Sequence, residues 1–485
     1  MTMNHERYRS DELLLVVGEA VGDRTHLHPS RLKQIDEHSD AYVERAQSEL
    51  PYMAWFVRQF SRSSPVLRVS SFAVYRFPSS HSYSCSLSYT TMSKFNLNWG
   101  ILATGGIAES FTRDLYPNPE CRGVKDIQHT VVAAASSSSA DRAKAFLKEV
   151  RAPESAKAYG SYKELVADPN VDIIYVATPH SHHYQNAMLC LEAGKNVLCE
   201  KAFTTNAKQT ELLIKKAKEK NVFLMEAVWT RYFPLSIYVR DIIKSGKIGP
   251  VSRTFADLSM SMVPENTFDD SHRMVNPDLA GGALLDLGIY ALTWVFQTLY
   301  TTQDKPQPPS VVSTMRKYKL GTDEQTSMLL TFPPTSARGE AHGIATTGMR
   351  TAADPDGKGS AGPAIRVQGE KGEIQVFHPA YRPTRTKLVL ADGTVEEKEF
   401  PQPGPGKGSG WKNGFGGNFH EEGMGHGMFW EADECAYALK EGRKEGQYES
   451  LEESLVIMKV MDEVRRQNGM TYPEKIETTE YPVEL

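Results

Sequence analysis

Two segments of this chain carry side chains that could share a proton. Lys201 follows the apolar run "NVLCE" (196–200), which ends in Glu200. In "LAGGALLDLGIYALTW" (279–294), Asp286 and Tyr290 are four residues apart, so on a helix they lie on one face. An ammonium group polarises a substrate oxygen and stabilises a phenolate, so lysine and tyrosine form a workable acid/base pair. The plain alternatives are a surface lysine at a strand end and a core helix with a polar tip.

A phosphate-binding turn is indicated by "GILATGGIAESF" (100–111), which follows an apolar strand and opens a helix. Against the dinucleotide fingerprint GxGxxG/A, the first glycine is replaced by Ala103. Gly105 lets backbone approach a pyrophosphate, and free N–H groups at a helix start attract the anion. The segment therefore predicts a coenzyme site at Thr104, Gly105, Gly106 and Ile107, although a tight strand-to-helix turn has the same pattern.

The end of the next strand bears on the choice of coenzyme. An NAD site places a carboxylate there to hold the ribose 2′-hydroxyl, but "AAASSSSADR" (133–142) has none before Asp141. Hydroxyl groups of Ser136 and Ser137, helped by Arg142, could instead accept a 2′-phosphate. NADP is therefore favoured, with NAD possible; the alternative is that the serines only cap the following helix.

A cluster of histidines follows the fourth apolar strand, in "ATPHSHHYQ" (177–185). Thr178 and Pro179 end the strand at its carboxyl end, where open α/β sheets bind ligands. His180 and His183 are about one helical turn apart, but no carboxylate or cysteine completes a ligand set, so no metal site is predicted. We expect Thr178, Pro179 and His183 to contact the coenzyme; a capping or solvated helix start is the alternative.

The elements that position these residues alternate regularly from residue 93. Helical stretches separate short β-branched runs, which we predict to be strands at 98–104, 129–135, 171–178, 195–201 and 222–228. Strand then helix, repeated, predicts an α/β fold with a doubly wound parallel sheet, a Rossmann domain over 93–225. Glu200 and Lys201 then lie at the coenzyme crevice.

A second domain is predicted over 226–475, where alternating strand-like segments replace the strand–helix rhythm. We predict an α+β domain with a large, mostly antiparallel open sheet.

Residues 1–91 differ in composition from the rest of the chain: positions 62–91 hold 10 serines and no acidic residue. We expect a poorly structured leader or a mis-assigned start, with Met92 as the true initiator.

Composition excludes several classes of partner. The 485 residues are 40% apolar and 24% charged, and a net charge of −5 leaves no basic excess for nucleic acid. No apolar run approaches the roughly 18 to 20 residues of a spanning helix, so no membrane is expected. Five scattered cysteines without ligand spacing, and no secretory signal, favour reduced thiols and a cytoplasmic location.

Residues 97–473 resemble the glucose-fructose oxidoreductase/inositol dehydrogenase (Gfo/Idh/MocA) family. Within it they are most similar to the branch of dimeric dihydrodiol dehydrogenases and fungal NADP-dependent D-xylose dehydrogenases. The resemblance implies a Rossmann domain, a substrate domain and a homodimer formed through the open sheet. It rests on "WGILATGGIA", "ATPHSHHYQNAMLCLEAGKNVLCEK", "MEAVWTRYFP", "HRMVNPDLAGGALLDLGIYALTW", "GEKGEIQVFHP" and "EADECAYALKEG".

The resemblance also implies roles for individual residues. Lys201 matches the lysine of the EKP motif, which contacts substrate and nicotinamide. Tyr290 matches the acid/base tyrosine of DLGxY, with Asp286 as its neighbouring carboxylate, and His183 matches the histidine of TPxxxH. In "EAVWTRYFP" (226–234), Trp229 and Arg231 are the expected substrate contacts, Trp229 by its match to an aromatic of the family's pocket.

Two positions depart from the family pattern. Ala202 replaces the proline of EKP, and a cis bond before a non-proline residue costs about 2.5–4 kcal/mol. Ser137 stands where NADP-using relatives often have arginine. The function implied is NADP-dependent oxidation of the anomeric carbon of D-xylose to its lactone. Oxidation of trans-dihydrodiols of arenes is the alternative, and a non-catalytic dinucleotide-sensing regulator is a rival of another class.

Overall fold

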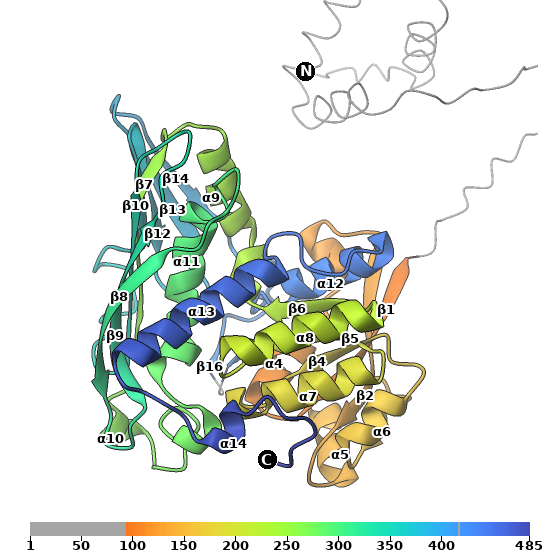
Figure 1. Ribbon diagram of the computed structural model, residues 1–485. Coiled ribbons are helices and arrows are strands. Elements are labelled where there is room, and N and C mark those ends of the chain that lie inside the picture. Colours follow the sequence, from red (N-terminus) through yellow and green to blue (C-terminus); the bar gives the residue numbers. More distant parts are fainter. Residues whose placement is uncertain (1–93, 416–417) are drawn as a thin grey trace, which may run out of the picture. The chain divides into compact units, whose positions relative to one another are not determined.

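A computed structural model describes residues 94–415 and 418–485 (Figure 1). The prediction for residues 1–91 lies outside this part of the chain. Two sheets organise the described residues, and the predicted fold class is confirmed: one sheet is parallel and the other mostly antiparallel.

The parallel sheet has six strands in the order β3-β2-β1-β4-β5-β6, the order of a dinucleotide-binding fold. The strands are β1 (Phe95–Leu102), β2 (Ile127–Ala135), β3 (Lys157–Tyr159), β4 (Ile173–Val176), β5 (Asn196–Glu200) and β6 (Leu224–Ala227). Five of them match predicted strands. The sequence missed β3, because it has three residues, none of them fully buried, and so no apolar run.

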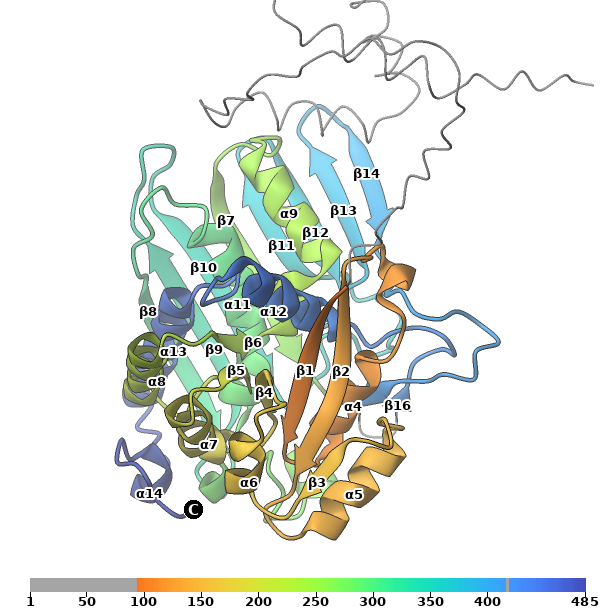
Figure 2. The ribbon, with the colours of Figure 1, turned by 90° about the vertical axis from the view of Figure 1, so that its right-hand side faces the viewer.

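Helices cover both faces of this sheet, as expected for parallel strands joined by crossovers. They are α4 (Gly106–Asp114), η2 (Pro119–Arg122), α5 (Ala140–Glu149), α6 (Tyr162–Ala167), α7 (His180–Glu192) and α8 (Ala207–Lys220). Figure 2 shows α4 and α5 on one side of the sheet and α7 and α8 on the other. The carboxyl ends of β1, β4 and β5 therefore meet at the start of α4.

The second sheet has eight strands in the order β14-β13-β12-β11-β7-β10-β9-β8. Its strands are β7 (Val251–Ser259), β8 (Ser310–Lys317), β9 (Asp323–Phe332), β10 (Ala341–Gly348), β11 (Pro363–Gly369), β12 (Gly372–Phe377), β13 (Arg385–Leu390) and β14 (Val395–Glu399). Only the β7–β10 pair is parallel among these neighbours. A two-stranded hairpin, β15 (Gly414–Phe415) and β16 (Asn418–Phe419), follows.

One face of the large sheet packs on α11 (Ile289–Leu299), and the closeness of the contact is set by Gly343. A Cβ added there would lie 2.3 Å from a methyl carbon of Val295.

The remaining helices are η3 (Trp229–Tyr232), α9 (Pro234–Lys244), α10 (Pro264–Thr267), η4 (Pro277–Leu279), η5 (Leu284–Gly288), α12 (Phe429–Glu441), α13 (Leu451–Gln467) and α14 (Glu474–Glu477).

The segment Pro277–Leu299 corrects one statement made from the sequence. It contains η4, η5 and α11, and an apolar window within it has a mean hydropathy of 1.6, so by length and composition the segment could cross a bilayer. However, 94% of its apolar window is buried inside the protein, which is typical of a core helix.

Helices α12 and α13 connect the two sheets. Helix α13 contacts both α8 and β8, and α12 contacts β1. Buried ion pairs join the same layers: Arg122 reaches Asp433 at 2.6 Å, and Arg231 reaches Glu453 at 2.8 Å. The large sheet is thereby held beside the parallel sheet, with α13 running between them (Figure 1).

Candidate active site

Asp286 holds the ammonium group of Lys201 at the carboxyl end of β5. Lys201 Nζ donates to both the carboxylate and the backbone oxygen of Asp286, each at 3.0 Å. Arg273 donates to the same carboxylate oxygen at 3.0 Å, and His180 Nε2 lies 4.0 Å from it. Burial would raise the pKa of Asp286, but Arg273 and then Lys201 outweigh it and hold that pKa far below its usual range. Asp286 is therefore a permanent anion that fixes Lys201.

The backbone around Asp286 is shaped by a buried contact with β9. Residues Leu284–Gly288 form one π-helical turn, not the α-helix assumed from the spacing. Gly282, at φ +123°, precedes it, and a Cβ there would lie 2.2 Å from the carboxylate of Asp323. That carboxylate accepts the backbone N–H of Leu284 at 2.8 Å. The glycine pair thus allows the helix to begin against another chain segment.

Tyr290 lies one turn further along, beside the same lysine. The ammonium of Lys201 is 5.2 Å from the centre of its ring. The indole N–H of Trp229 donates to the phenolic oxygen of Tyr290 at 2.7 Å. Burial, followed by the charge of Glu200, raises the pKa of Tyr290 well above its usual value, whereas the Trp229 hydrogen bond lowers it. The structure therefore brings Lys201, Asp286, Tyr290 and Trp229 into one cluster.

Aromatic side chains extend this cluster into a wall. His426 stacks on Trp229 with ring centres 4.8 Å apart, and His420 Nε2 lies 2.7 Å from His426 Nδ1. Tyr381 lies 6.0 Å from Tyr290 and 6.2 Å from Trp229, measured between ring centres. Burial lowers the pKa of His426 to about 3 and that of His420 to about 4, so both rings are neutral at physiological pH.

The segment that carries His426 is fixed to helix α4 of the first domain. The buried carboxylate of Asp114, at the end of α4, accepts the backbone N–H groups of His426, Gly427 and Met428 at 2.7–3.0 Å. Arg382 donates to the carbonyl of His426 at 2.6 Å. Sequence reasoning missed this wall, because a loop rich in glycine shows no periodic pattern.

The turn between β1 and α4 fits the phosphates of a dinucleotide. Gly105 is the N-cap of α4, its backbone is extended, and no side chain caps the N–H groups that follow. Gly105 and Gly106 are exposed, and a Cβ on Gly105 would meet no atom within 4 Å. Thr104 and Ile107 flank them, half-buried. Ala103, in place of the first glycine, adopts φ +89°. Free N–H groups facing open space suit an anion.

The serines after β2 divide into two groups. Ser139 caps α5, since its hydroxyl accepts the backbone N–H of Arg142 at 3.2 Å, so the capping alternative is confirmed for this residue. Ser136 is buried and lies 3.0 Å from Ser138, hydroxyl to hydroxyl. Ser137 and the Arg142 side chain are exposed, and both act on the pKa of Tyr162. Their assignment to the 2′-phosphate stays a prediction.

Comparison with known proteins gives the family. Residues 97–228 match the family model described as "Oxidoreductase family, NAD-binding Rossmann fold", and residues 237–375 match the GFO/IDH/MocA C-terminal domain. The chain belongs to the GFO/IDH/MocA oxidoreductase family. The resemblance drawn from the sequence is confirmed.

This chain covers almost the full length of several known relatives. D-xylose 1-dehydrogenase (NADP(+)) of Hypocrea jecorina is 55% identical over 80% of this chain and 96% of its own. Human trans-1,2-dihydrobenzene-1,2-diol dehydrogenase is 34% identical over 78% of this chain and 98% of its own. The crystal structure of aldose-aldose oxidoreductase from Caulobacter crescentus shares the fold, with a TM-score of 0.58, 21% identity, and coverage of 77% and 97%.

Three predicted contacts of this GFO/IDH/MocA member need correction. Arg231 is fully buried and binds Glu453 and the carbonyl of Thr293, so it supports the domain interior instead of contacting substrate. The carboxylate of Glu200 accepts the hydroxyl of Tyr175 at 2.5 Å and the N–H of Lys201 at 3.2 Å. Because Glu200 is buried and its carboxylate accepts from these protein groups, it is not assigned as a coenzyme contact.

His183 is the third correction. Its two ring nitrogens lie 2.8 Å from the carbonyl of Thr178 and 2.9 Å from that of Ala202, and burial lowers its pKa to about 4. No polar atom of this ring is left for a coenzyme. The ring of His183 instead lies between the carbonyl of Thr178 and the carbonyl of Ala202, the residue that follows the cis peptide bond from Lys201.

Proposed function

We propose that the protein oxidises the anomeric carbon of an aldopyranose, D-xylose, to the lactone with NADP. The observation that carries the proposal is the cluster in which Lys201, fixed by Asp286, lies 5.2 Å from the ring of Tyr290. The cluster lies at the carboxyl end of β5, on the edge of the sheet that faces α4. The 55% identity to D-xylose 1-dehydrogenase (NADP(+)) supports the choice of substrate and coenzyme.

The residues of this chain have distinct roles in the proposed reaction. The coenzyme supplies the acceptor for the hydride that leaves C1. Tyr290, as phenolate, takes the proton of the C1 hydroxyl, and the C–O bond becomes the lactone carbonyl. Lys201 polarises the same oxygen, and the indole N–H of Trp229 stabilises the phenolate. Asp286 keeps Lys201 in place.

The coenzyme contacts belong to this proposal. Thr104, Gly105, Gly106 and Ile107 present the start of α4 to the pyrophosphate. Ser137, just after β2, and Arg142, in the first turn of α5, are both exposed and hold the 2′-phosphate, with the buried Ser136 beside Ser137. We assign residues 93–225 to the coenzyme domain and residues 226–475 to the substrate and dimerisation domain.

Oxidation of trans-dihydrodiols is the second candidate, favoured by the 34% identity to the human dihydrodiol dehydrogenase. Both reactions remove a hydride from a carbon that bears a hydroxyl group, so the cluster suits either. A dinucleotide-sensing regulator without activity is disfavoured, because it would have no use for a fixed lysine beside Tyr290.

A coenzyme-reduction screen over aldoses and arene dihydrodiols, with NADP and with NAD, tests the proposal. We expect NADPH formation with D-xylose. Lys201→Ala and Tyr290→Phe should reduce turnover by about a hundredfold or more and leave NADP binding measurable. Tyr300→Phe, at the end of the same helix, is the matched control. Reduction of NADP by a dihydrodiol and by no aldose would overturn the sugar assignment.

We further propose a homodimer formed through the open face of the large sheet. On this face Val312, Leu329, Ile344 and Phe255 lie side by side in adjacent strands. Val312 is 69% exposed and Leu329 45%, which leaves an apolar row in solvent. Light scattering should give twice the chain mass, and Leu329→Lys should halve it. Val395→Lys, on the edge strand β14, should have no such effect.

A cytoplasmic location also forms part of the proposal. The four cysteines in the described part of the chain are free thiols, and three of them are buried. Such thiols persist in a reducing compartment. Fractionation with an antibody against the native protein would test this, and recovery with secreted proteins would contradict it.

A further inference from the structure

One face of helix α4 is covered by strand β15, which comes from a distant part of the chain. Gly106, Ser110 and Asp114 are spaced four residues apart, so they lie along this face. The hydroxyl of Ser110 donates to the carbonyl of Gly414 at 2.5 Å, across 304 residues of sequence. The helix that opens at the predicted phosphate turn therefore has a neighbour from outside the parallel sheet.

Asn413 fixes the direction in which this strand runs along α4. Its side chain is buried, and its amide group donates to the carbonyl of Ser110 and to the carboxylate of Asp114, each at 2.7 Å. The strand thus runs from the end of α4 toward its start, where Phe415 follows. A Cβ on Gly106 would lie 3.8 Å from the ring of Phe415. Phe415 is therefore placed beside the exposed glycine turn.

The long loop around the hairpin is folded on itself. Backbone hydrogen bonds join the N–H of Gly406 to the carbonyl of Gly423 at 3.1 Å and the N–H of Gly423 to the carbonyl of Trp411 at 2.8 Å. A Cβ on Gly423 would overlap the carbonyl group of Gly406, so this close approach needs glycine. The hairpin therefore stands on a compact base.

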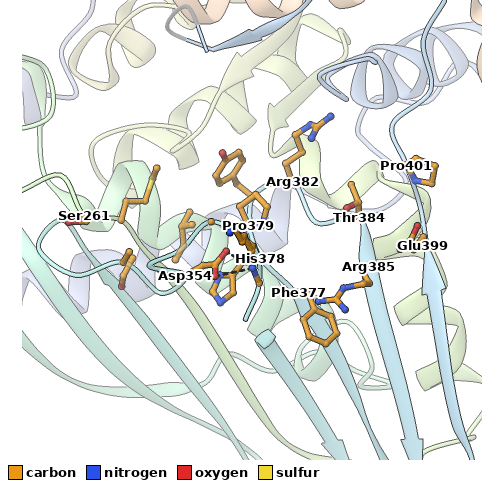
Figure 3. A pocket seen from close by; sticks show the side chains of 18 of the residues that line it. Ser261, Asp354, Phe377, His378, Pro379, Arg382, Thr384, Arg385, Glu399 and Pro401 are labelled. Carbon is orange, nitrogen blue, oxygen red and sulfur yellow. Dashed lines mark hydrogen bonds between the residues drawn. The ribbon is translucent and has the colours of Figure 1, made fainter. Parts of the chain in front are cut away.

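The same loop continues to the aromatic wall of the candidate active site. The carboxylate of Asp114 that binds Asn413 also accepts the backbone N–H of His426 at 3.0 Å. Arg382 donates to the carbonyl of His426 at 2.6 Å, and Figure 3 shows its guanidinium turned away from Arg385. The segment that carries Phe415 is thus fixed both on α4 and at the wall.

The ring of Phe415 is partly in solvent. It is 43% exposed, and among the exposed large apolar side chains in the described part of the chain it is the only aromatic one. Beside it, no side chain caps the N–H groups at the start of α4. A ligand that covers both needs an anion with carbon groups next to it, and a pyrophosphate flanked by ribose rings has this composition. The positive edge of an aromatic ring also suits phosphate oxygens.

We propose that Phe415 is a coenzyme contact whose ring covers the pyrophosphate and the adjoining ribose at the start of α4. This inference rests on the coenzyme contacts of the proposed function, and it adds one from outside the parallel sheet. With the ring in place, fewer water molecules reach the phosphate, so its attraction to the N–H groups is screened less. Asn413 is a positioning residue, because it acts by holding the strand on α4.

Titration of the full chain with NADPH, followed by the fluorescence of NADPH, tests this contact. Phe415→Ala should raise the Kd for NADPH about tenfold. Phe415→Tyr keeps the ring and should stay within about twofold of the wild type. Asn413→Ala should raise the Kd in the same direction as Phe415→Ala. Val395→Ala is the matched control, because Val395 is also apolar and 53% exposed, but lies on β14.

Adenosine 2′-phosphate, in competition with NADPH, separates a contact from a general loss of structure. It carries the 2′-phosphate but no pyrophosphate, so its Kd should not change in Phe415→Ala or Asn413→Ala. Because Phe415 is exposed, its variants should fold even if Asn413→Ala does not. An equal rise in Kd for both ligands overturns the inference, as does an unchanged Kd for NADPH in Phe415→Ala.

These outcomes are distinct from those of the proposed function. If Phe415→Ala weakens NADPH binding alone but no aldose is oxidised, the contact stands and the substrate assignment fails. If D-xylose is oxidised and Phe415→Ala binds NADPH like the wild type, only the contact fails. Wild-type protein that binds no NADPH overturns both.

Discussion

Replacing Trp229 by phenylalanine removes the N–H that donates to the phenolic oxygen of Tyr290 at 2.7 Å. Trp229 is 4% exposed and Tyr290 6%, so water cannot readily supply a substitute donor. The phenolate is the charged form and gains most from the hydrogen bond. Its loss therefore raises the pKa of Tyr290 further above the ordinary value, in the same direction as burial.

The size of the shift follows from the strength of such a bond. A hydrogen bond to a charged group contributes about 1.5–3 kcal/mol, and about 1.4 kcal/mol corresponds to one pKa unit. The pKa of Tyr290 should thus rise by about 1–2 units in Trp229→Phe. A base acts in its deprotonated form, so kcat/KM for oxidation rises with pH. The variant should therefore need a pH about 1–2 units higher to reach the same fraction of its maximal kcat/KM.

The assay is kcat/KM for D-xylose with saturating NADP, from neutral to strongly alkaline pH. Xylose deuterated at C1 shows where hydride transfer limits the rate. At neutral pH the variant should be about tenfold to a hundredfold slower, and the difference should shrink as the pH rises. Trp430→Phe is the control, because Trp430 also donates its indole N–H, to Gln402 at 2.9 Å, away from Tyr290.

One result would refute the reasoning about Tyr290. If Trp229→Phe lowers kcat/KM by the same factor at every pH, the tryptophan shapes the pocket but does not act on the charge of the phenolate. A shift of equal size in Trp430→Phe would instead point to a general loss of stability.

Three further substitutions test other parts of the site. Asp286→Asn removes the anion that binds Lys201 and Arg273, and should lower kcat about a hundredfold while the NADP dissociation constant changes little. Ser137→Asp should repel the 2′-phosphate and raise the KM ratio of NADP to NAD about tenfold. Ala103→Gly relieves the strain of φ +89° and should raise the free energy of unfolding in urea by about 0.5 kcal/mol.

Each of these three substitutions has a control variant and a result that would contradict the prediction. Asp278→Asn, in the same segment as Asp286, should leave kcat unchanged. If kcat falls equally in Asp278→Asn, Asp286 has no special role. Ser137→Asn should keep the preference for NADP. If it changes the KM ratio of NADP to NAD as much as Ser137→Asp does, the effect of the aspartate does not come from its charge. Ala108→Gly, inside α4, should destabilise the protein. Destabilisation by Ala103→Gly as well would show that its backbone is not strained.

Much of the coenzyme domain follows from local sequence. Apolar runs and amphipathic stretches alternate, and this pattern alone predicts five of the six parallel strands. Strands of this kind end in a known place relative to the following helix, so Lys201 and Gly105 could be assigned to one edge of the sheet. The spacing of Asp286 and Tyr290 likewise predicted a shared face, because the chain between them stays helical.

Contacts between residues that are far apart in the chain could not be predicted from the sequence. Arg231 looked like a substrate contact beside Trp229, but it pairs with Glu453, 222 residues away. The N–H of Trp229 reaches Tyr290 across 61 residues, and the wall formed by Tyr381 and His426 comes from loops without a periodic pattern.

There is a physical reason why local elements could be predicted from the sequence and long-range contacts could not. Hydrophobic periodicity and turn chemistry act between near neighbours, so the sequence by itself determined which segments are strands and helices and that Lys201 ends a buried strand. The direction of a buried polar side chain depends on which partner satisfies it, and partners such as Asp286 for Lys201, 85 residues apart, become neighbours only when the two sheets pack. Tertiary structure alone decided which of the predicted residues come together and which, like Glu200, are bound by other groups of the protein.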